Sequence, residues 1–285
     1  MKLPFFLARR FVAAESIEET LPVAAALKKK GLHVTLDRLG EYVSDPHLAE
    51  SARDGYIKLV RAIAASDSDI DRNISIKLSM LGQKIDESFC RDNLYQLLDT
   101  ARETDSFVRL DMEGSDVTES TLSLFETART EYPNSVGIVL QAYLKRTKED
   151  VQRMCDLNAR VRLCKGAYKE PEAIAHQNMS VIRDRFCEYM EMLLASARYP
   201  AIATHDDILI NQTKAYIQAN GVEPSRFEFQ MLYGMRADTQ IAISKEGFNM
   251  RVYVPFGSTW FPYFSRRIRE RKENVFFVLK NLIRK

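Results

Sequence analysis

The chain has 285 residues, a length typical of one α/β barrel, with 28% charged and 46% hydrophobic side chains. Its formal net charge of +2 is too small to indicate nucleic-acid binding, and no apolar run approaches the length of a membrane span. The arginines near the N-terminus follow the short apolar patch instead of preceding it, which argues against a secretory signal peptide. Because no low-complexity or Pro/Gly/Ser-rich segment divides the chain, we expect a single domain over residues 1–285.

Eight short strand-like runs, separated by helical patterns, recur along the chain. A helical segment near 16–30 precedes the first strand, and long helical patterns follow the first strand over 46–66 and the fifth over 172–197. The predicted strands span residues 32–39, 74–80, 107–113, 136–143, 160–166, 201–205, 227–232 and 250–255. Eight such repeats favour a (β/α)8 barrel. An open doubly wound sheet is the competing fold, but its dinucleotide-binding form needs a GxGxxG motif that the sequence lacks.

The first three predicted strands alternate apolar and polar side chains, and the polar face is unusual. We expect the apolar face to pack against the outer helices and the polar face to line the lumen. Barrel interiors are usually aliphatic, so Lys77, Arg109, Asp111 and Glu113 in the lumen require pairing or a ligand. An ion-pair network at the barrel floor is the open alternative, above all for Arg109. Lys77 and Asp111 lie toward the C-terminal strand ends, where barrel active sites occur.

Polar and cationic residues also lie at the ends of the fourth, fifth and sixth strands. They are Gln141, Arg162, Lys165, Gly166, Thr204 and His205. The cations suit a flat anionic ligand such as a phosphate-bearing cofactor, and the glycine lets a ligand approach the backbone closely. Local turn and helix-cap bonding is the alternative role for Thr204 and His205.

The last helical stretch carries a polar aromatic, two guanidiniums and a carboxylate on one face. Tyr263, Arg266, Arg267 and Glu270 have i, i+3, i+4 and i+7 spacing. An arginine fork binds a carboxylate in bidentate fashion, and the glutamate is close enough to hold the two arginines in place. The alternative is a solvated basic helix end, because more basic residues follow directly.

Other chemistries have weaker support. The four cysteines lack CxxC spacing, which indicates reduced thiols in a cytosol-like compartment, and the four histidines form no HxH or HExxH pair, so no metal site is expected. The GxSxG elbow of a Ser-His-Asp hydrolase is missing. A Schiff-base lyase or aldolase using Lys77 or Lys165 stays open, as does a barrel that only binds or assembles.

The ordered motifs from residue 10 to the C-terminus resemble the proline dehydrogenase family, in its short monofunctional bacterial form. They are RFVAAE, TLDRLGE, SIKLSMLG, RLDMEG, QAYLKRT, RLCKGAYKEP, ATHD, FEFQMLYGM and YVPFG followed by W, Y and RRIRE. The resemblance implies a (β/α)8 barrel that binds FAD and places its eighth helix over the substrate. It also implies oxidation of L-proline to Δ1-pyrroline-5-carboxylate by hydride transfer to FAD, the first step of proline catabolism. Electrons would pass to a membrane quinone, so we expect a cytoplasmic protein, with a peripheral position on the inner face of the membrane left open.

The same resemblance assigns roles residue by residue. Lys77, Arg266 and Arg267 would bind the proline carboxylate, with Glu270 near the ring end of the substrate and Asp111 as a polar partner. The pyrrolidine ring would be enclosed by Tyr168, Leu232, Tyr253 and Tyr263. FAD would be held by Gln141, Arg162, Lys165, Gly166, Ala167, Tyr168, Thr204 and His205, with Arg162 near the flavin N5.

Overall fold

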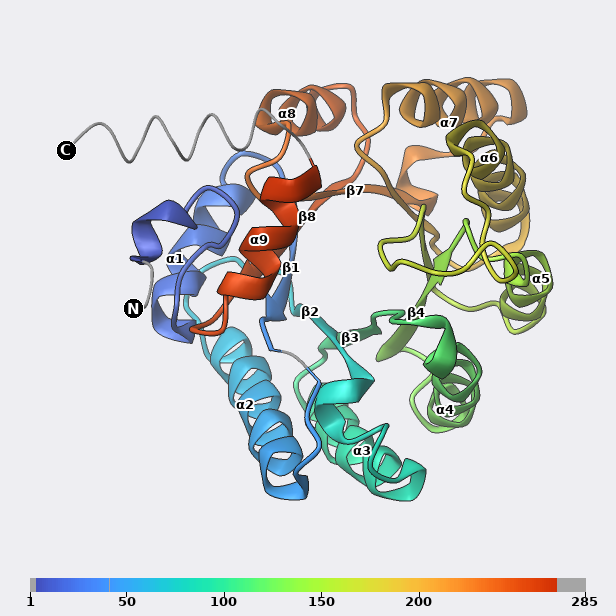
Figure 1. Ribbon diagram of the computed structural model, residues 1–285. Coiled ribbons are helices and arrows are strands. Elements are labelled where there is room, and N and C mark those ends of the chain that lie inside the picture. Colours follow the sequence, from blue (N-terminus) through green and yellow to red (C-terminus); the bar gives the residue numbers. More distant parts are fainter. Residues whose placement is uncertain (1–3, 41, 271–285) are drawn as a thin grey trace.

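The computed structural model describes residues 4–40 and 42–270, and its centre is a closed parallel barrel (Figure 1). Each strand pairs with the next, and β8 pairs in parallel with β1 over six residues. The strands are β1 His33–Arg38, β2 Asn73–Ile76, β3 Phe107–Leu110, β4 Val136–Gln141, β5 Val161–Cys164, β6 Ala201–Ala203, β7 Glu228–Leu232 and β8 Met250–Phe256. The predicted (β/α)8 barrel is therefore confirmed, and the open sheet is excluded.

Helices cover the outside of the barrel, and one helix lies across its open end (Figure 1). The α-helices are α1 Ile17–Lys28, α2 Pro46–Ala64, α3 Glu87–Glu103, α4 Thr118–Glu131, α5 Thr147–Asp156, α6 Met179–Ser196, α7 Asp207–Asn220, α8 Ala237–Lys245 and α9 Phe261–Glu270. Four 3₁₀ turns are η1 Phe5–Leu7, η2 Leu78–Leu81, η3 Ser115–Val117 and η4 Pro224–Arg226. The helix expected near 16–30 is confirmed as α1. Because α1 precedes β1, α9 is the eighth helix of the βα repeats. Within the described ranges, no helix is long and apolar enough to cross a membrane.

The predicted second strand was too long. β2 ends at Ile76, and the segment expected to continue it forms the 3₁₀ turn η2. The carboxylate of Glu113 accepts bonds from the backbone N–H of Ser79 at 3.1 Å and from its hydroxyl at 2.7 Å. At Ser79, a carboxylate from the loop after β3 thus takes the place of the strand-to-strand hydrogen bonds that a longer β2 would make. The alternation of side chains in the sequence could not reveal this.

The helix predicted over 172–197 begins seven residues later, at Met179. Asn178 caps it by accepting a bond from the backbone N–H of Ser180 at 2.8 Å. The segment before the cap instead forms the loop that follows β5 at the open end of the barrel. The apolar pattern of this loop comes from packing, since Ala175 is fully buried beside Tyr143.

Apolar side chains of the strands and helices form one continuous core around the barrel. Ile74 of β2 and Val108 of β3 are fully buried in the same cluster as Leu59 of α2 and Leu94 of α3. The apolar face of the strands therefore points outward, as predicted, and the lumen is left to polar groups.

The N-terminal end of the barrel contains a buried ion pair and a buried arginine. Arg251 Nε lies 2.9 Å from Glu228 Oε1, and both side chains are almost fully buried. Although burial alone would raise it, the guanidinium of Arg251 lowers the pKa of Glu228 to about 2. Arg109 donates to the carbonyl of Arg160 at 2.6 Å and lies over the ring of Phe107. Arg109 therefore lies in the closed barrel floor, but among the described residues it bonds to backbone carbonyls and not to a carboxylate, so the ion-pair alternative holds for Arg251 and Glu228 and not for Arg109 itself.

We predict that Glu228→Gln lowers the free energy of unfolding by about 3–5 kcal/mol at pH 7, because it leaves the buried charge of Arg251 uncompensated. The folded-state pKa of Glu228 lies below its ordinary value of 4.5. Its stabilising contribution is therefore complete above about pH 4.5 and is lost as the pH falls toward 2. Urea unfolding at a series of pH values should show the gap between wild type and variant closing over this window.

The double variant Glu228→Gln/Arg251→Met is the control, because it removes the uncompensated charge and should recover part of the lost stability. An equal loss of stability at pH 7 and pH 3 would show that the ion pair does not account for the effect.

Candidate active site

A cavity of about 1060 Å³ opens at the C-terminal ends of the strands and reaches under α9. This volume lies at the upper end of the range for small-molecule sites, so a cofactor and a small substrate both have room. All predicted site residues whose side chains are described line it. They are Lys77, Asp111, Gln141, Arg162, Lys165, Gly166, Ala167, Tyr168, Thr204, His205, Leu232, Tyr253, Tyr263, Arg266 and Arg267. Glu270 ends α9, but its side chain lies outside the described ones, so its role stays a prediction.

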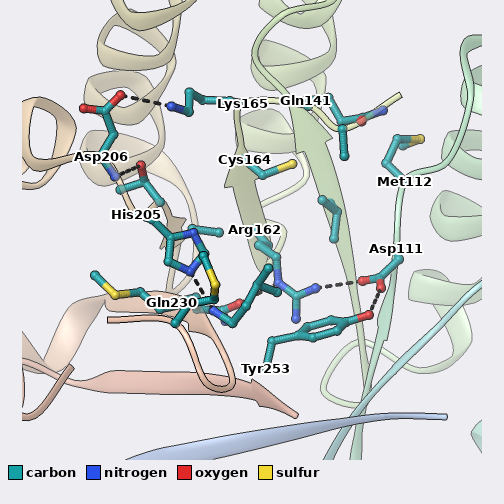
Figure 2. Close-up of a pocket in the computed structure, with 18 of the residues that line it drawn as sticks. Asp111, Met112, Gln141, Arg162, Cys164, Lys165, His205, Asp206, Gln230 and Tyr253 are labelled. Carbon is teal, nitrogen blue, oxygen red and sulfur yellow. Dashed lines mark hydrogen bonds and ion pairs between the residues drawn. The ribbon is translucent and has the colours of Figure 1, made fainter. Parts of the chain in front are cut away.

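Asp111 is the centre of the polar cluster in this cavity (Figure 2). Its Oδ1 accepts a bond from Arg162 Nη1 at 2.7 Å, and its Oδ2 accepts one from the Tyr253 hydroxyl at 2.7 Å. The guanidinium of Arg162 also lies over the Tyr253 ring, 5.2 Å from its centroid. Burial and the carboxylates of Asp111 and Asp37 raise the pKa of Tyr253 well above its ordinary value, so its hydroxyl keeps its proton at neutral pH and donates the hydrogen bond to Asp111.

Lys77 is held by a residue that was not among the predicted site residues. Its Nζ lies 3.0 Å from Asp37 Oδ1 and 4.0 Å from Asp111 Oδ2, and Asp37 is 1% exposed. Burial would lower the pKa of Lys77, but the two carboxylates raise it above its ordinary value, so the amine stays protonated. The available signal for Asp37 was its place on the polar face of the first predicted strand, at the end that meets the cavity.

Thr204 makes the local turn bond that was the alternative for it, whereas the ring of His205 bonds to the distant end of β7, and both residues line the cavity. Thr204 Oγ1 accepts the backbone N–H of Asp206 at 3.1 Å. His205 Nε2 lies 3.0 Å from the backbone nitrogen of Leu232, which donates to it. In its neutral form this histidine therefore carries its ring proton on Nδ1.

The helix over the cavity is fastened by apolar contacts away from its arginines. Trp260, 5% exposed, packs edge-on against Phe264 and Phe5, and its indole N–H donates to Glu15 at 3.1 Å. On the cavity side, the guanidinium of Arg267 lies 5.3 Å from the ring centroid of Tyr263. The one-face pattern expected for this helix is confirmed for its described side chains, since Tyr263, Arg266 and Arg267 all line the cavity.

Gly166 closes the cavity wall after β5 in a conformation that disfavours any side chain. Its φ is +119°, and a Cβ would lie 2.2 Å from the Tyr143 ring.

We predict that Gly166→Ala costs about 2–5 kcal/mol of unfolding free energy, from backbone strain together with displacement of that ring. Gly221→Ala is the matched control, since that glycine also has positive φ but nothing within 4 Å. Its cost should be only about 1–2 kcal/mol by chemical denaturation. Equal costs would mean that the ring moves freely.

A closed parallel barrel with a polar cavity at the C-terminal strand ends defines the class of (β/α)8 enzymes. The family described as "Proline dehydrogenase" matches residues 20–280, and the chain belongs to this family. It is 40% identical over 278 residues to "Proline dehydrogenase 1" of Bacillus subtilis subsp. natto, covering 98% of this chain and 91% of the relative. It is 38% identical to "Proline dehydrogenase" of Deinococcus radiodurans, covering 98% and 90%.

Solved structures agree on the fold. The crystal structure of proline utilization A from Bdellovibrio bacteriovorus, inactivated by N-propargylglycine, superposes with a TM-score of 0.85 and 27% sequence identity. The match covers 93% of this chain but only 32% of that chain, so it corresponds to part of a larger protein.

Proposed function

We propose that the chain oxidises L-proline to Δ1-pyrroline-5-carboxylate, with FAD as the hydride acceptor. Family membership supports proline as the substrate. The observation that carries the proposal is the meeting of cations from two unrelated elements in one cavity. Lys77, after β2, and the arginine pair of α9 line the same space as the Asp111 cluster. An anionic small molecule bound there would touch both the barrel and the helix over it.

The substrate carboxylate is bound by Arg266, Arg267 and Lys77. Hydrogen bonds to charged groups are worth roughly 1.5–3 kcal/mol each, so these contacts can dominate the affinity for so small a ligand. Lys77 suits this role because Asp37 and Asp111 keep it protonated. Tyr168, Leu232, Tyr253 and Tyr263 enclose the pyrrolidine ring, and Glu270 lies near the end of the ring.

The residues at the other side of the cavity fit FAD. Gly166 lines the cavity, and a cavity of about 1060 Å³ can hold cofactor and substrate together. Arg162 would lie near the flavin N5, and the rest of the cofactor would be held by the other lining residues at this side, which are Gln141, Lys165, Ala167, Tyr168, Thr204 and His205. FAD, when bound, supplies the acceptor for the hydride that leaves the ring carbon beside the nitrogen.

The protein itself positions the reacting groups and supplies the electrostatic field around them. Asp111 holds Arg162 and Tyr253 in one orientation through its two oxygens, so the charges around the ring do not rearrange when substrate binds. The hydrogen of the C–H bond beside the nitrogen would leave as a hydride to the acceptor that FAD supplies, and the proton on the nitrogen would leave to solvent. The product then contains a C=N bond. Closure by α9 limits access of water to this product.

We further propose that the electrons pass on to a membrane quinone and that the protein, one barrel domain over 1–285, is cytoplasmic with peripheral contact to the inner face of the membrane. The family resemblance supports this assignment. The sequence RRIRERK at residues 266–272 supplies cations of the kind that bind anionic lipid head groups.

A Schiff-base lyase using Lys77 is disfavoured, because an amine kept protonated by two carboxylates is a poor nucleophile. Borohydride trapping of a carbonyl substrate on Lys77 or Lys165 would nevertheless establish that chemistry. A barrel that only binds would hold proline without turning it over.

We predict that the purified protein is yellow, that L-proline bleaches it without oxygen, and that the flavin is bound noncovalently. No sequence feature marks an attachment residue, so acid or heat precipitation should release all the flavin into solution. Absorbance at the flavin bands, before and after anaerobic addition of L-proline, is the measurement. A colourless protein, or one that stays yellow with L-proline, would overturn the proposed function; flavin retained in the pellet would overturn only the noncovalent assignment.

We predict that Arg266→Lys and Arg267→Lys each weaken L-proline binding roughly tenfold to a hundredfold while leaving FAD binding nearly unchanged. Lysine keeps the charge but loses the planar fork, so the substitution is not conservative at a bidentate site. Steady-state KM values for L-proline and inhibition constants for tetrahydro-2-furoic acid should change in parallel, since both ligands have the ring and the carboxylate.

Pyrrolidine is the control ligand, because it has the ring without the carboxylate. It should bind poorly to wild type and respond little to either substitution. If its binding fell as much as that of L-proline, the arginines would be shaping the pocket instead of holding the carboxylate.

A further inference from the structure

A second charged cluster lines the cavity where the loop after β5 meets α6 and α7. Lys165 Nζ and Arg183 Nε both contact Asp206 Oδ2, at 3.0 Å and 2.9 Å. Figure 2 shows the Lys165–Asp206 pair at the opposite side of the pocket from Asp111 and Tyr253. Two cations thus share one carboxylate oxygen, and their side chains stay 29% and 34% exposed toward the cavity mouth.

Arg183 is part of none of the sequence motifs, yet its side chain lines the cavity from α6. Only its Nε is bonded to protein in the described part of the chain, so both Nη groups are left to solvent or a ligand. Nearby, Arg236 contacts Asp207 and the carbonyl of His205. The cavity rim therefore has three cations, Lys165, Arg183 and Arg236, against two carboxylates, Asp206 and Asp207.

Asp206 is suited to holding the two cations in place. It is 9% exposed, and it also caps α7 by accepting the backbone N–H of Ile208 at 3.2 Å. Burial opposes its ionisation, but Arg183 and Lys165 lower the pKa of Asp206, so it stays anionic. A carboxylate fixed to a helix end thus orients an ammonium and a guanidinium toward the same space.

We propose that Arg183, together with Lys165, binds the diphosphate of FAD and that Asp206 is the positioning residue for both cations. This inference rests on the proposed function, since it assumes that the cavity holds FAD. Arg183 lines the cavity, and the geometry of a guanidinium matches the paired oxygens of a phosphate. Lys165 directly follows β5, three residues beyond Arg162, so the cofactor would extend from the flavin contact at Arg162 outward to this rim.

The test uses apoprotein freed of flavin, titrated with FAD and with riboflavin, with binding read from flavin fluorescence. Riboflavin has the same ring system without phosphate. Arg183→Gln should weaken FAD binding roughly tenfold to a hundredfold and leave riboflavin binding unchanged. Arg185→Gln is the matched control, because Arg185 lies on the same helix, pairs with Glu188 and does not line the cavity. It should leave both affinities as in wild type.

An unchanged FAD affinity in Arg183→Gln would overturn the proposal, and so would an equal loss for FAD and riboflavin, which would assign Arg183 to cavity shape. If Arg183→Gln does not fold, Arg183→Lys replaces it and should show a smaller loss for FAD alone. The proposed function is judged separately: wild type that binds FAD and is bleached by L-proline retains that function even if Arg183 has no effect.

Discussion

The double hydrogen bond of Asp111 to Arg162 and Tyr253 is the interaction on which the site depends. It joins the residue after β3 to side chains within β5 and β8, and its partners lie 51 and 142 residues away in the chain. Charged groups in a barrel lumen are costly unless each is paired. Here one carboxylate satisfies a guanidinium and a phenol at once, and Lys77 lies between it and Asp37. The C-terminal part of the lumen can therefore contain charged groups, because these side chains are paired with one another.

The barrel lumen contains two layers of polar side chains, one at each end, and the two layers have different roles. At the N-terminal end, Glu228 and Arg251 bind each other, and Arg109 binds backbone carbonyls, so this layer stabilises the fold and is closed to ligands. At the C-terminal end, the charged groups are paired but still line a cavity. Residue type does not distinguish the layers, since both contain arginines and carboxylates on inward-facing strand positions. The two layers differ in their position along the barrel axis. In other (β/α)8 barrels too, the C-terminal end holds the active site and the N-terminal end contributes to stability.

The helix over the cavity depends on packing at a distance from the chemistry. Trp260 and Phe264 bury α9 against the N-terminal segment, which contributes Phe5 and Phe11. The side of α9 that faces the cavity is polar. Because the apolar contacts on the other side hold the helix, the charged groups that face the cavity are not needed for this purpose. The position of Arg266 and Arg267 relative to Lys77 is consequently set by apolar contacts to a part of the chain more than 240 residues earlier in sequence.

The sequence by itself determined the barrel, because hydrophobic alternation and turn-separated repeats are local signals that recur eight times. It also determined which side chains lie at the strand ends and on one face of α9, since both follow from the periods of strand and helix. Tertiary structure alone decided where β2 ends, because the Glu113 carboxylate that binds Ser79 comes from the next repeat. It alone decided that Arg109 belongs to the floor, that Asp37 holds Lys77, and that Arg183 meets Asp206. The last two pairings join residues that are 40 and 23 positions apart, and no local pattern records which charges a closed barrel will bring within 3 Å of each other.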